Sequence, residues 1–287
     1  MTASDQRRAA SPIVEEVLKD LAAEGAAVES LVAHLDESGW RTMTPAEGWD
    51  IATTIAHLLW TDENSVHAID GTLLLNGPAD KDAWDAVVMK AFADPTGFVD
   101  TEAYALAKEL TGAELLARWQ TSRSVLEEKL RTVPDGQKLM WFGPPMSAAS
   151  MATARLMETW AHGLDIANAL GVTVAPTNRI RHVASIGVRT RNFAFANNEL
   201  PAPAEEFRVD LVGPEEDVWS WGPEDAKQTV TGSAYDFARL VTQRLHRDDT
   251  DLVAYGADAE TWLEIAQCFA GPAGGGREPR HTQGERA

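Results

Sequence analysis

The sequence predicts an α+β protein, in which an N-terminal antiparallel four-helix bundle precedes a smaller C-terminal α/β domain. Up to about residue 171, four long segments repeat apolar residues every three or four positions, as amphipathic helices do. After the prolines at 201 and 203, short segments alternate apolar and polar residues, as strands do. A chain of 287 residues can hold two such domains. We expect the four-helix bundle over 11–172, a connecting helix and linker over 173–204, an α/β domain over 205–270 and a disordered tail over 271–287.

The first two helices have recognisable start signals. Ser11 before Pro12 is typical of a helix N-terminus, and Gly39 is expected to end this helix. Asp50 is expected to cap the second helix, which carries His57. At about 100° per residue, His57 lies opposite the Ile/Leu stripe of its helix. Its ring is therefore in solvent or against a polar cavity.

The other two helices of the bundle follow a less regular stretch over 76–100, where we expect one short helix around Trp84. Thr111 and Glu114 form a capping box that opens the third long helix. The fourth occupies 147–171. It carries the residues on which the functional argument depends.

The C-terminal part is expected to begin with a helix over roughly 178–197. A helix around Phe237 precedes the last strand, and a final helix carries Cys268, which we interpret as a buried thiol. Four short segments read as strands: 207–212, 217–221, 228–231 and 252–255.

Composition limits the classes of partner and compartment. The net charge of −19 argues against duplex nucleic acid and anionic membranes, which need Lys and Arg to neutralise phosphate. A single cysteine allows neither an intramolecular disulfide nor a cysteine-based zinc site. No apolar run approaches the ~20 residues of a membrane span, and the N-terminus does not resemble a signal peptide. We expect a cytoplasmic protein.

Candidate metal ligands lie on the fourth helix. Glu158, His162 and Asp165 are spaced i, i+4 and i+7, which places them on one face. A catalytic zinc site uses three nitrogen or oxygen ligands and leaves one position open. His57 would complete the set from a facing helix, and Asp165 could accept a hydrogen bond from a ligand imidazole.

The alternative is that these residues form only the solvated face of an amphipathic helix. Pairs at this spacing are frequent, and Glu63 with His67 is another example. The position of His57 separates the two interpretations. If its ring lay more than about 5 Å from both Glu158 and His162, ligand bonds of ~2 Å could not form.

Two segments carry a family resemblance. Residues 48–58, with His57, and residues 158–167, with Glu158 and His162, resemble the DinB-like metal-binding family, in particular its mycothiol-dependent maleylpyruvate isomerase branch. The resemblance implies that His57, Glu158 and His162 bind a divalent metal, most often Zn²⁺. It also implies mycothiol as cosubstrate and a C-terminal domain similar to a sterol-carrier fold.

The resemblance further implies a role for Arg244 in binding substrate or thiol. The family often has Gly-Arg at this place, whereas here Gln243 precedes the arginine, and an arginine at a helix C-terminus can instead serve the helix dipole. The predicted function is a metal-dependent, thiol-dependent transferase or isomerase acting on a small electrophilic substrate, with Asp165 and Arg244 as supporting residues. A metal-dependent hydrolase or cyclase, and a non-catalytic, metal-stabilised protein that binds a small ligand, are the alternatives.

Overall fold

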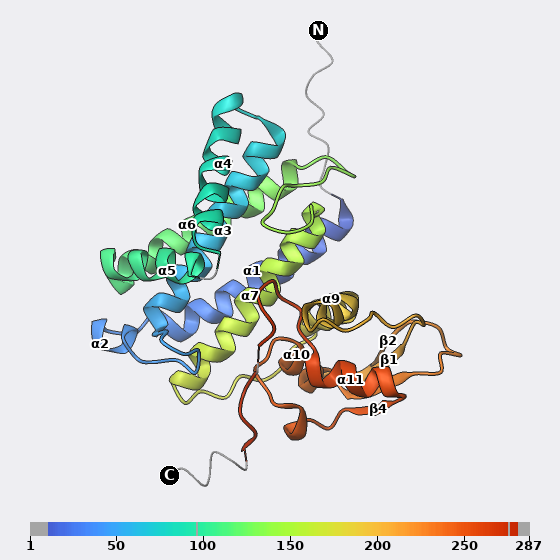
Figure 1. The fold of residues 1–287 in the computed structure, drawn as a ribbon. Helices are drawn as coiled ribbons and strands as arrows, with labels where there is room; N and C mark the ends of the chain where they lie inside the picture. Colours follow the sequence, from blue (N-terminus) through green and yellow to red (C-terminus); the bar gives the residue numbers. More distant parts are fainter. Residues whose placement is uncertain (1–10, 96, 275, 281–287) are drawn as a thin grey trace. The chain divides into compact units, whose positions relative to one another are not determined.

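The computed structural model of the chain (Figure 1) describes residues 11–95, 97–274 and 276–280. The chain divides into two compact units, Met1–Thr173 and Val174–Ala287, called the N-terminal and C-terminal units below. The structure is mostly helical and has one small sheet, in the C-terminal unit. Of the tail expected to be disordered, residues 281–287 lie outside the described residues.

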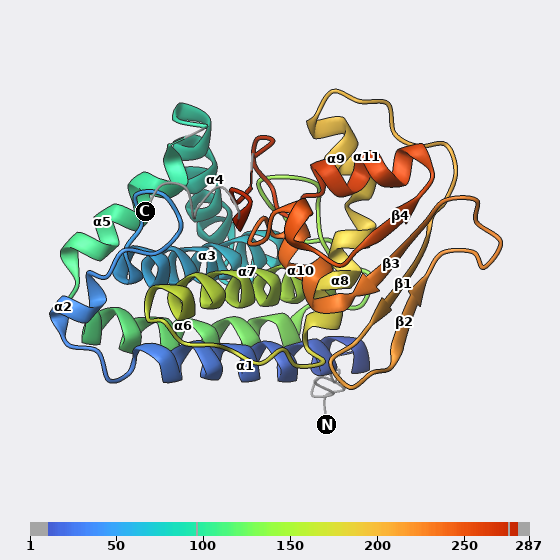
Figure 2. The ribbon, with the colours of Figure 1, turned by 90° about the horizontal axis from the view of Figure 1, so that it is seen from below.

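Four long helices form the frame of the N-terminal unit, and Figure 2 shows them running side by side. α1 packs on α7 and α3 packs on α6, with further contacts between α3 and α7 and between α1 and α6. Their side-chain caps agree with the sequence: Asp50 accepts from the backbone N–H of Thr53, and Thr111 and Glu114 form the capping box. The bounds are α1 Pro12–Val32, α3 Ile51–Leu73, α6 Gly112–Thr132 and α7 Ala148–Ala169.

The prediction that the first helix continues to Gly39 is wrong. α1 ends at Val32, and a separate short helix, α2, spans Glu37–Trp40. Asp36 explains the break, because its carboxylate accepts from the Gly39 N–H and caps the new turn.

Two further helices occupy the stretch between α3 and α6. α4 (Pro78–Ala93) is the helix expected around Trp84, whereas α5 (Phe98–Glu109) was not predicted. α5 buries mainly Phe98 and two alanines, which leave no stripe of large apolar residues to recognise. Both helices pack on α3, so α3 is buried nearly all round along its first three turns.

The C-terminal unit contains a four-stranded sheet in the order β2-β1-β3-β4. β1 pairs antiparallel with β2 and parallel with β3, and β3 pairs antiparallel with β4. The four predicted strands are present. Their bounds are β1 Arg208–Val212, β2 Val218–Trp221, β3 Thr229–Ser233 and β4 Val253–Tyr255; the helices are α8 Ile180–Arg189, α9 Arg191–Asn197, α10 Ala234–Val241, the 3-10 turn η1 Arg247–Asp249 and α11 Ala257–Ile265.

Two helix predictions in this unit need correction. The helix expected over 178–197 is two helices divided at Thr190, whose hydroxyl binds the carbonyl groups of Ile186 and Gly187 and so competes with the helical ladder. The last helix ends at Ile265, before Cys268. That thiol is buried, as expected, and the Cys268 backbone N–H donates to the Val241 carbonyl.

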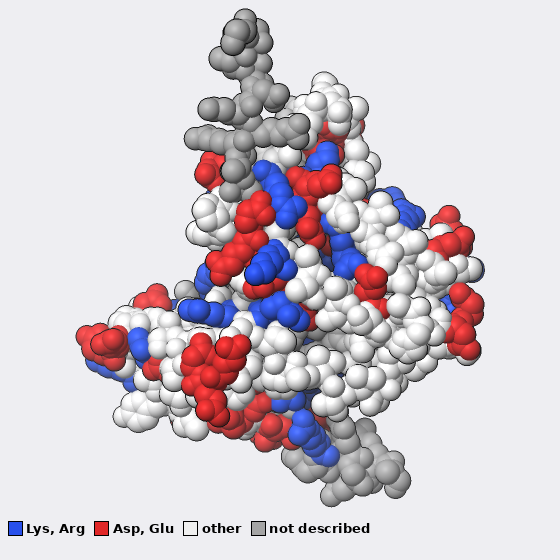
Figure 3. Space-filling model, turned by 180° about the vertical axis from the view of Figure 1, so that it is seen from behind, with Lys and Arg blue, Asp and Glu red and all other residues white. Residues whose placement is uncertain are grey.

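Charges of both signs are interleaved on the face shown in Figure 3, where Lys and Arg side chains lie among Asp and Glu side chains. No helix in the part of the chain that the structure describes combines the length and the apolar character that a membrane span requires.

Candidate metal centre

α3 and α7 bring His57, Glu158 and His162 together. The Nε2 atoms of His57 and His162 each lie 3.3 Å from the same oxygen, Glu158 Oε2. One ligand atom from each residue lies within 4.8 Å of the other two. A tetrahedral ion with ligand bonds of about 2.0–2.2 Å separates its ligand atoms by roughly 3.3–3.6 Å. The two His–Glu distances have this size, so the three side chains are a candidate donor set for one divalent ion.

His57 faces this cluster and not solvent. Its exposed fraction is 7%, and its Nδ1 atom is buried without a hydrogen-bond partner among the described residues. An unsatisfied buried polar atom costs about 1–3 kcal/mol. Among the described residues, the contact that holds this ring in the cluster is the one between Nε2 and Glu158.

Asp165 lies behind the second histidine. Its Oδ2 atom is 3.4 Å from Nδ1 of His162, and the carboxylate is buried. With Nδ1 turned to Asp165, the other ring nitrogen of His162 faces Glu158. This is the arrangement in which an outer carboxylate fixes the tautomer and orientation of a metal-binding imidazole.

Trp49 covers both imidazole rings and was not predicted as part of the site. Its ring is stacked on His162, with centroids 5.6 Å apart and planes 18° apart, and its centroid lies 5.0 Å from that of His57. Trp49 Nε1 donates to Asp100 of α5 at 3.2 Å. The only sequence signal is its place within the family-like segment, directly before the cap residue Asp50.

A buried ion pair joins the two helices that carry the candidate ligands. Arg155 Nε of α7 donates to Asp62 Oδ1 of α3 at 2.9 Å, and both residues are 3% exposed. Asp62 Oδ2 also accepts from Trp119 Nε1 of α6 at 3.1 Å. Sequence reasoning missed this pair because 93 residues separate its members and no spacing rule connects them.

The competing Glu63 and His67 pair does not form a site. Glu63 binds the guanidinium of Arg118 through both carboxylate oxygens, at 2.8 and 2.9 Å. His67 is exposed. The i, i+4 spacing alone therefore does not distinguish the two pairs; the residues that face them do.

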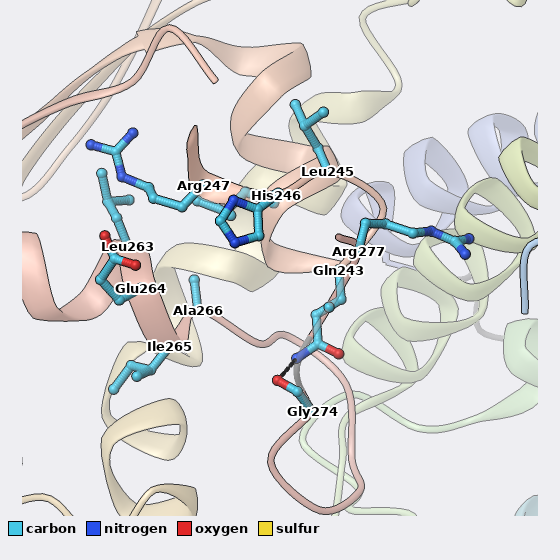
Figure 4. A pocket seen from close by; sticks show the side chains of 12 residues that line it. Gln243, Leu245, His246, Arg247, Leu263, Glu264, Ile265, Ala266, Gly274 and Arg277 are labelled. Carbon is cyan, nitrogen blue, oxygen red and sulfur yellow. Dashed lines mark hydrogen bonds between the residues drawn. The ribbon is translucent and has the colours of Figure 1, made fainter. Parts of the chain in front are cut away.

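Arg244 belongs to the C-terminal unit, just after α10. Its Nη1 atom donates to the carbonyl of Thr242, the C-cap residue that follows α10, as the helix-dipole alternative requires. The preceding Gln243 has φ +60°, a left-handed conformation that suits the glycine frequent in the family. Figure 4 shows the Gln243 amide in a small pocket beside His246 and Arg247, bonded to the carbonyl of Gly274. A role for Arg244 in binding substrate stays a prediction.

The surroundings of the cluster set the protonation states of His57 and Glu158. Burial lowers the pKa of His57 to about 4; the hydrogen bond to Glu158 opposes this shift, and His162 adds to it. Burial would raise the pKa of Glu158, but hydrogen bonds to His162 and His57 hold it well below its ordinary value. At neutral pH His57 is neutral and Glu158 ionised, the forms that bind metal.

The metal-free protein is expected to lose stability as the pH falls from 6.5 towards 4. Unfolded His57 takes up a proton near its ordinary pKa of 6.5, whereas folded His57 does so only near 4, so the unfolded state binds more protons in this window. His57 alone contributes about 3 kcal/mol to this loss. Glu158 adds a loss of the same sign below its ordinary pKa of 4.5.

Urea unfolding of EDTA-treated protein at several pH values measures this dependence, and His57→Gln is the control that should flatten it. A free energy of unfolding that does not change between neutral pH and about pH 4.5 would contradict the expected protonation states.

Comparison with known proteins places the chain in a family. Residues 21–167 match the model of the mycothiol maleylpyruvate isomerase N-terminal domain. Two uncharacterised proteins, from two strains of Mycobacterium tuberculosis, are each 54% identical over 258 residues, covering 90% of this chain and 96% of the relative.

Two solved structures have a similar fold. They are those of a mycothiol-dependent maleylpyruvate isomerase and of its histidine-to-alanine mutant, with TM-scores of 0.52 and 0.56. Each is 16% identical in sequence and covers 84% of this chain and 92% of the solved one. The fold is thus that of the maleylpyruvate isomerase, and on the match over residues 21–167 the chain belongs to the family of the mycothiol maleylpyruvate isomerase N-terminal domain.

Proposed function

We propose that the protein is a metal-dependent enzyme that uses a low-molecular-weight thiol, mycothiol or a close relative, to isomerise or transfer a small electrophilic substrate. The observation that carries this proposal is the convergence of His57, Glu158 and His162 inside the family domain. Family membership supports the thiol. Two imidazoles and one carboxylate are donors that suit Zn²⁺. We also propose that the N-terminal unit is a DinB-like four-helix bundle and that the C-terminal unit resembles a sterol-carrier fold.

The residues of the cluster have separate tasks. His57, Glu158 and His162 would hold the ion, and Asp165 keeps Nδ1 of His162 occupied so that Nε2 stays available. An ion held by these residues would lower the pKa of a thiol bound to it and so favour the thiolate. Trp49 shields both imidazoles from water. In this proposal Arg244 binds an anionic part of substrate or thiol.

The test is turnover of maleylpyruvate by zinc-loaded protein with and without mycothiol. We expect isomerisation that requires both, that stops after EDTA treatment and that returns with Zn²⁺. Turnover of a substrate by the metal-loaded protein without any thiol would favour the hydrolase or cyclase alternative. Protein purified without a histidine tag that holds no metal, and takes up none, would overturn the proposal.

Asp165→Asn is expected to lower zinc affinity by about 10–100-fold, the usual effect of removing a carboxylate behind a metal-binding histidine. The asparagine keeps the size of the side chain but no longer supplies a negative charge at Nδ1 of His162. Competition with a fluorescent chelator measures the affinity. Glu63→Gln, which alters a carboxylate bound to Arg118 at the surface, is the control and should bind zinc like the wild type. Equal affinities for all three proteins would remove Asp165 from the site.

A further inference from the structure

A second cavity, of about 270 Å³, lies within the C-terminal unit. Small-molecule pockets start at about 300 Å³, so this volume suits a ligand of one or two rings or a short chain. The cavity is partly open to solvent, and its lining comes from α8, α9, β1, α11 and the residues that precede β1 and follow β2. Its apolar lining comes from Val188, Phe207, Val209 and Trp262, and its cationic lining from Arg189 and Arg191.

Arg191 is the buried charge of this cavity, with an exposed fraction of 8%. Its guanidinium lies over the Phe207 ring, 4.3 Å from the centroid, and Nε donates to the Asn192 side chain at 3.0 Å. Among the residues that the structure describes, its carboxylate partner is Glu206, 3.7 Å from Nη1 and with a side chain that is 74% exposed. Stacking on Phe207 and the hydrogen bond to Asn192 orient the planar guanidinium, while the opposing carboxylate of Glu206 lies exposed at the surface.

Trp262 gives an independent indication of a ligand. The side chain is 1% exposed, it lines the cavity, and its Nε1 atom has no hydrogen-bond partner among the described residues. Its ring packs against Phe207 and Phe237, with centroids 5.8 and 5.6 Å away. A buried indole N–H normally finds an acceptor. The cavity therefore offers an apolar wall, an oriented cation and an unused N–H donor.

We propose that this cavity binds a small organic carboxylate, whose apolar body contacts Phe207, Val209 and Trp262 and whose carboxylate is bound by Arg191. A carboxylate matches the buried guanidinium of Arg191 in charge and in its two-oxygen geometry. All lining residues belong to the C-terminal unit, and none is a candidate metal ligand. The inference therefore goes beyond the proposed function and does not depend on the metal.

The test uses the full-length chain, stripped of metal with EDTA so that a carboxylate cannot bind an ion, and 2-naphthoate as probe. By titration calorimetry we expect saturable binding, and binding at least about tenfold weaker for the neutral 2-naphthamide. Arg191→Gln should weaken 2-naphthoate by at least about tenfold. Arg181→Gln removes the same charge from an exposed site on α8 that does not line the cavity, and should stay within about twofold of wild type.

Trp262→Phe supplies a second readout that does not need Arg191→Gln to fold. The variant keeps an aromatic ring but lacks the N–H, and comparing its ¹⁵N–¹H spectrum with that of the wild type identifies the indole signal of Trp262 among those of ten tryptophans. In wild type this signal should shift on addition of 2-naphthoate, with the same dissociation constant as the calorimetric one. Absence of saturable binding, equal binding of the amide, an unmoved Trp262 signal, or a folded Arg191→Gln variant that binds like wild type would overturn the proposal.

Discussion

Arg155→Ala is expected to lower the free energy of unfolding by about 3–5 kcal/mol, because it leaves the Asp62 carboxylate buried without its counter-charge. Burial already raises the pKa of Asp62 above its ordinary value, against the opposing effect of Arg155. The loss should therefore be larger at neutral than at acidic pH, where protonation removes the buried charge. Urea unfolding followed by circular dichroism, at neutral and at acidic pH, measures the loss in the free energy of unfolding and its dependence on pH.

Two variants make this result interpretable. Arg118→Ala breaks the exposed pair with Glu63 and should cost no more than about 1 kcal/mol. The double variant Asp62→Leu with Arg155→Met replaces the buried pair by apolar side chains and should regain part of the loss. If Arg155→Ala were no more destabilising than Arg118→Ala, the pair would not be what fixes α3 against α7.

His162→Ala is expected to reduce zinc affinity by at least about 100-fold, since it removes one of the three proposed protein ligands. Glu158 Oε2 would then retain a single imidazole contact, that of His57. Elemental analysis of tag-free protein after dialysis against a zinc buffer, together with calorimetric titration, measures the change. Thiol-dependent turnover should fall in parallel with metal content.

His67→Ala is the matched control, because it removes a histidine at the same i, i+4 distance from a glutamate but at an exposed position on α3. It should bind one zinc ion with wild-type affinity. Stoichiometric, tight zinc in His162→Ala would rule out the proposed ligand set, and loss of zinc in His67→Ala would place the metal elsewhere.

The long helices could be predicted because their apolar periods and caps are local features of the chain. Asp50 and the Thr111–Glu114 box set two helix starts without reference to any other segment. α5 could not be predicted, because two of its three buried residues are alanines, which become informative only when the packing against α3 is known. The break at Thr190 likewise depends on the hydrogen bonds that its hydroxyl donates to the carbonyl groups of Ile186 and Gly187, and the apolar pattern does not indicate these bonds.

The candidate site was predictable where its residues share a helix and a family-like segment. Helical spacing places Glu158, His162 and Asp165 on one face of α7. The position of His57 opposite the apolar stripe of its own helix agrees with the structure, in which that side of α3 meets α7. Helical spacing could not tell solvent from a polar cluster for that ring, because α4 and α5 close around α3 and bury its polar side too. Trp49, Asp62 and Arg155 act through partners far away in the chain, and no local pattern indicates them.

The hydrogen bond from Trp49 to Asp100 links α5, which lies in the irregular stretch between α3 and α6, to the candidate metal site. α5 contributes no candidate ligand, yet it supplies the acceptor that steadies the indole above His57 and His162. Substitutions in α5, or changes in the length of the chain between α3 and α6, can therefore alter what reaches the two histidines without touching either. Sequence change in this segment can thus reshape the surroundings of the two histidines while the histidines themselves stay in place.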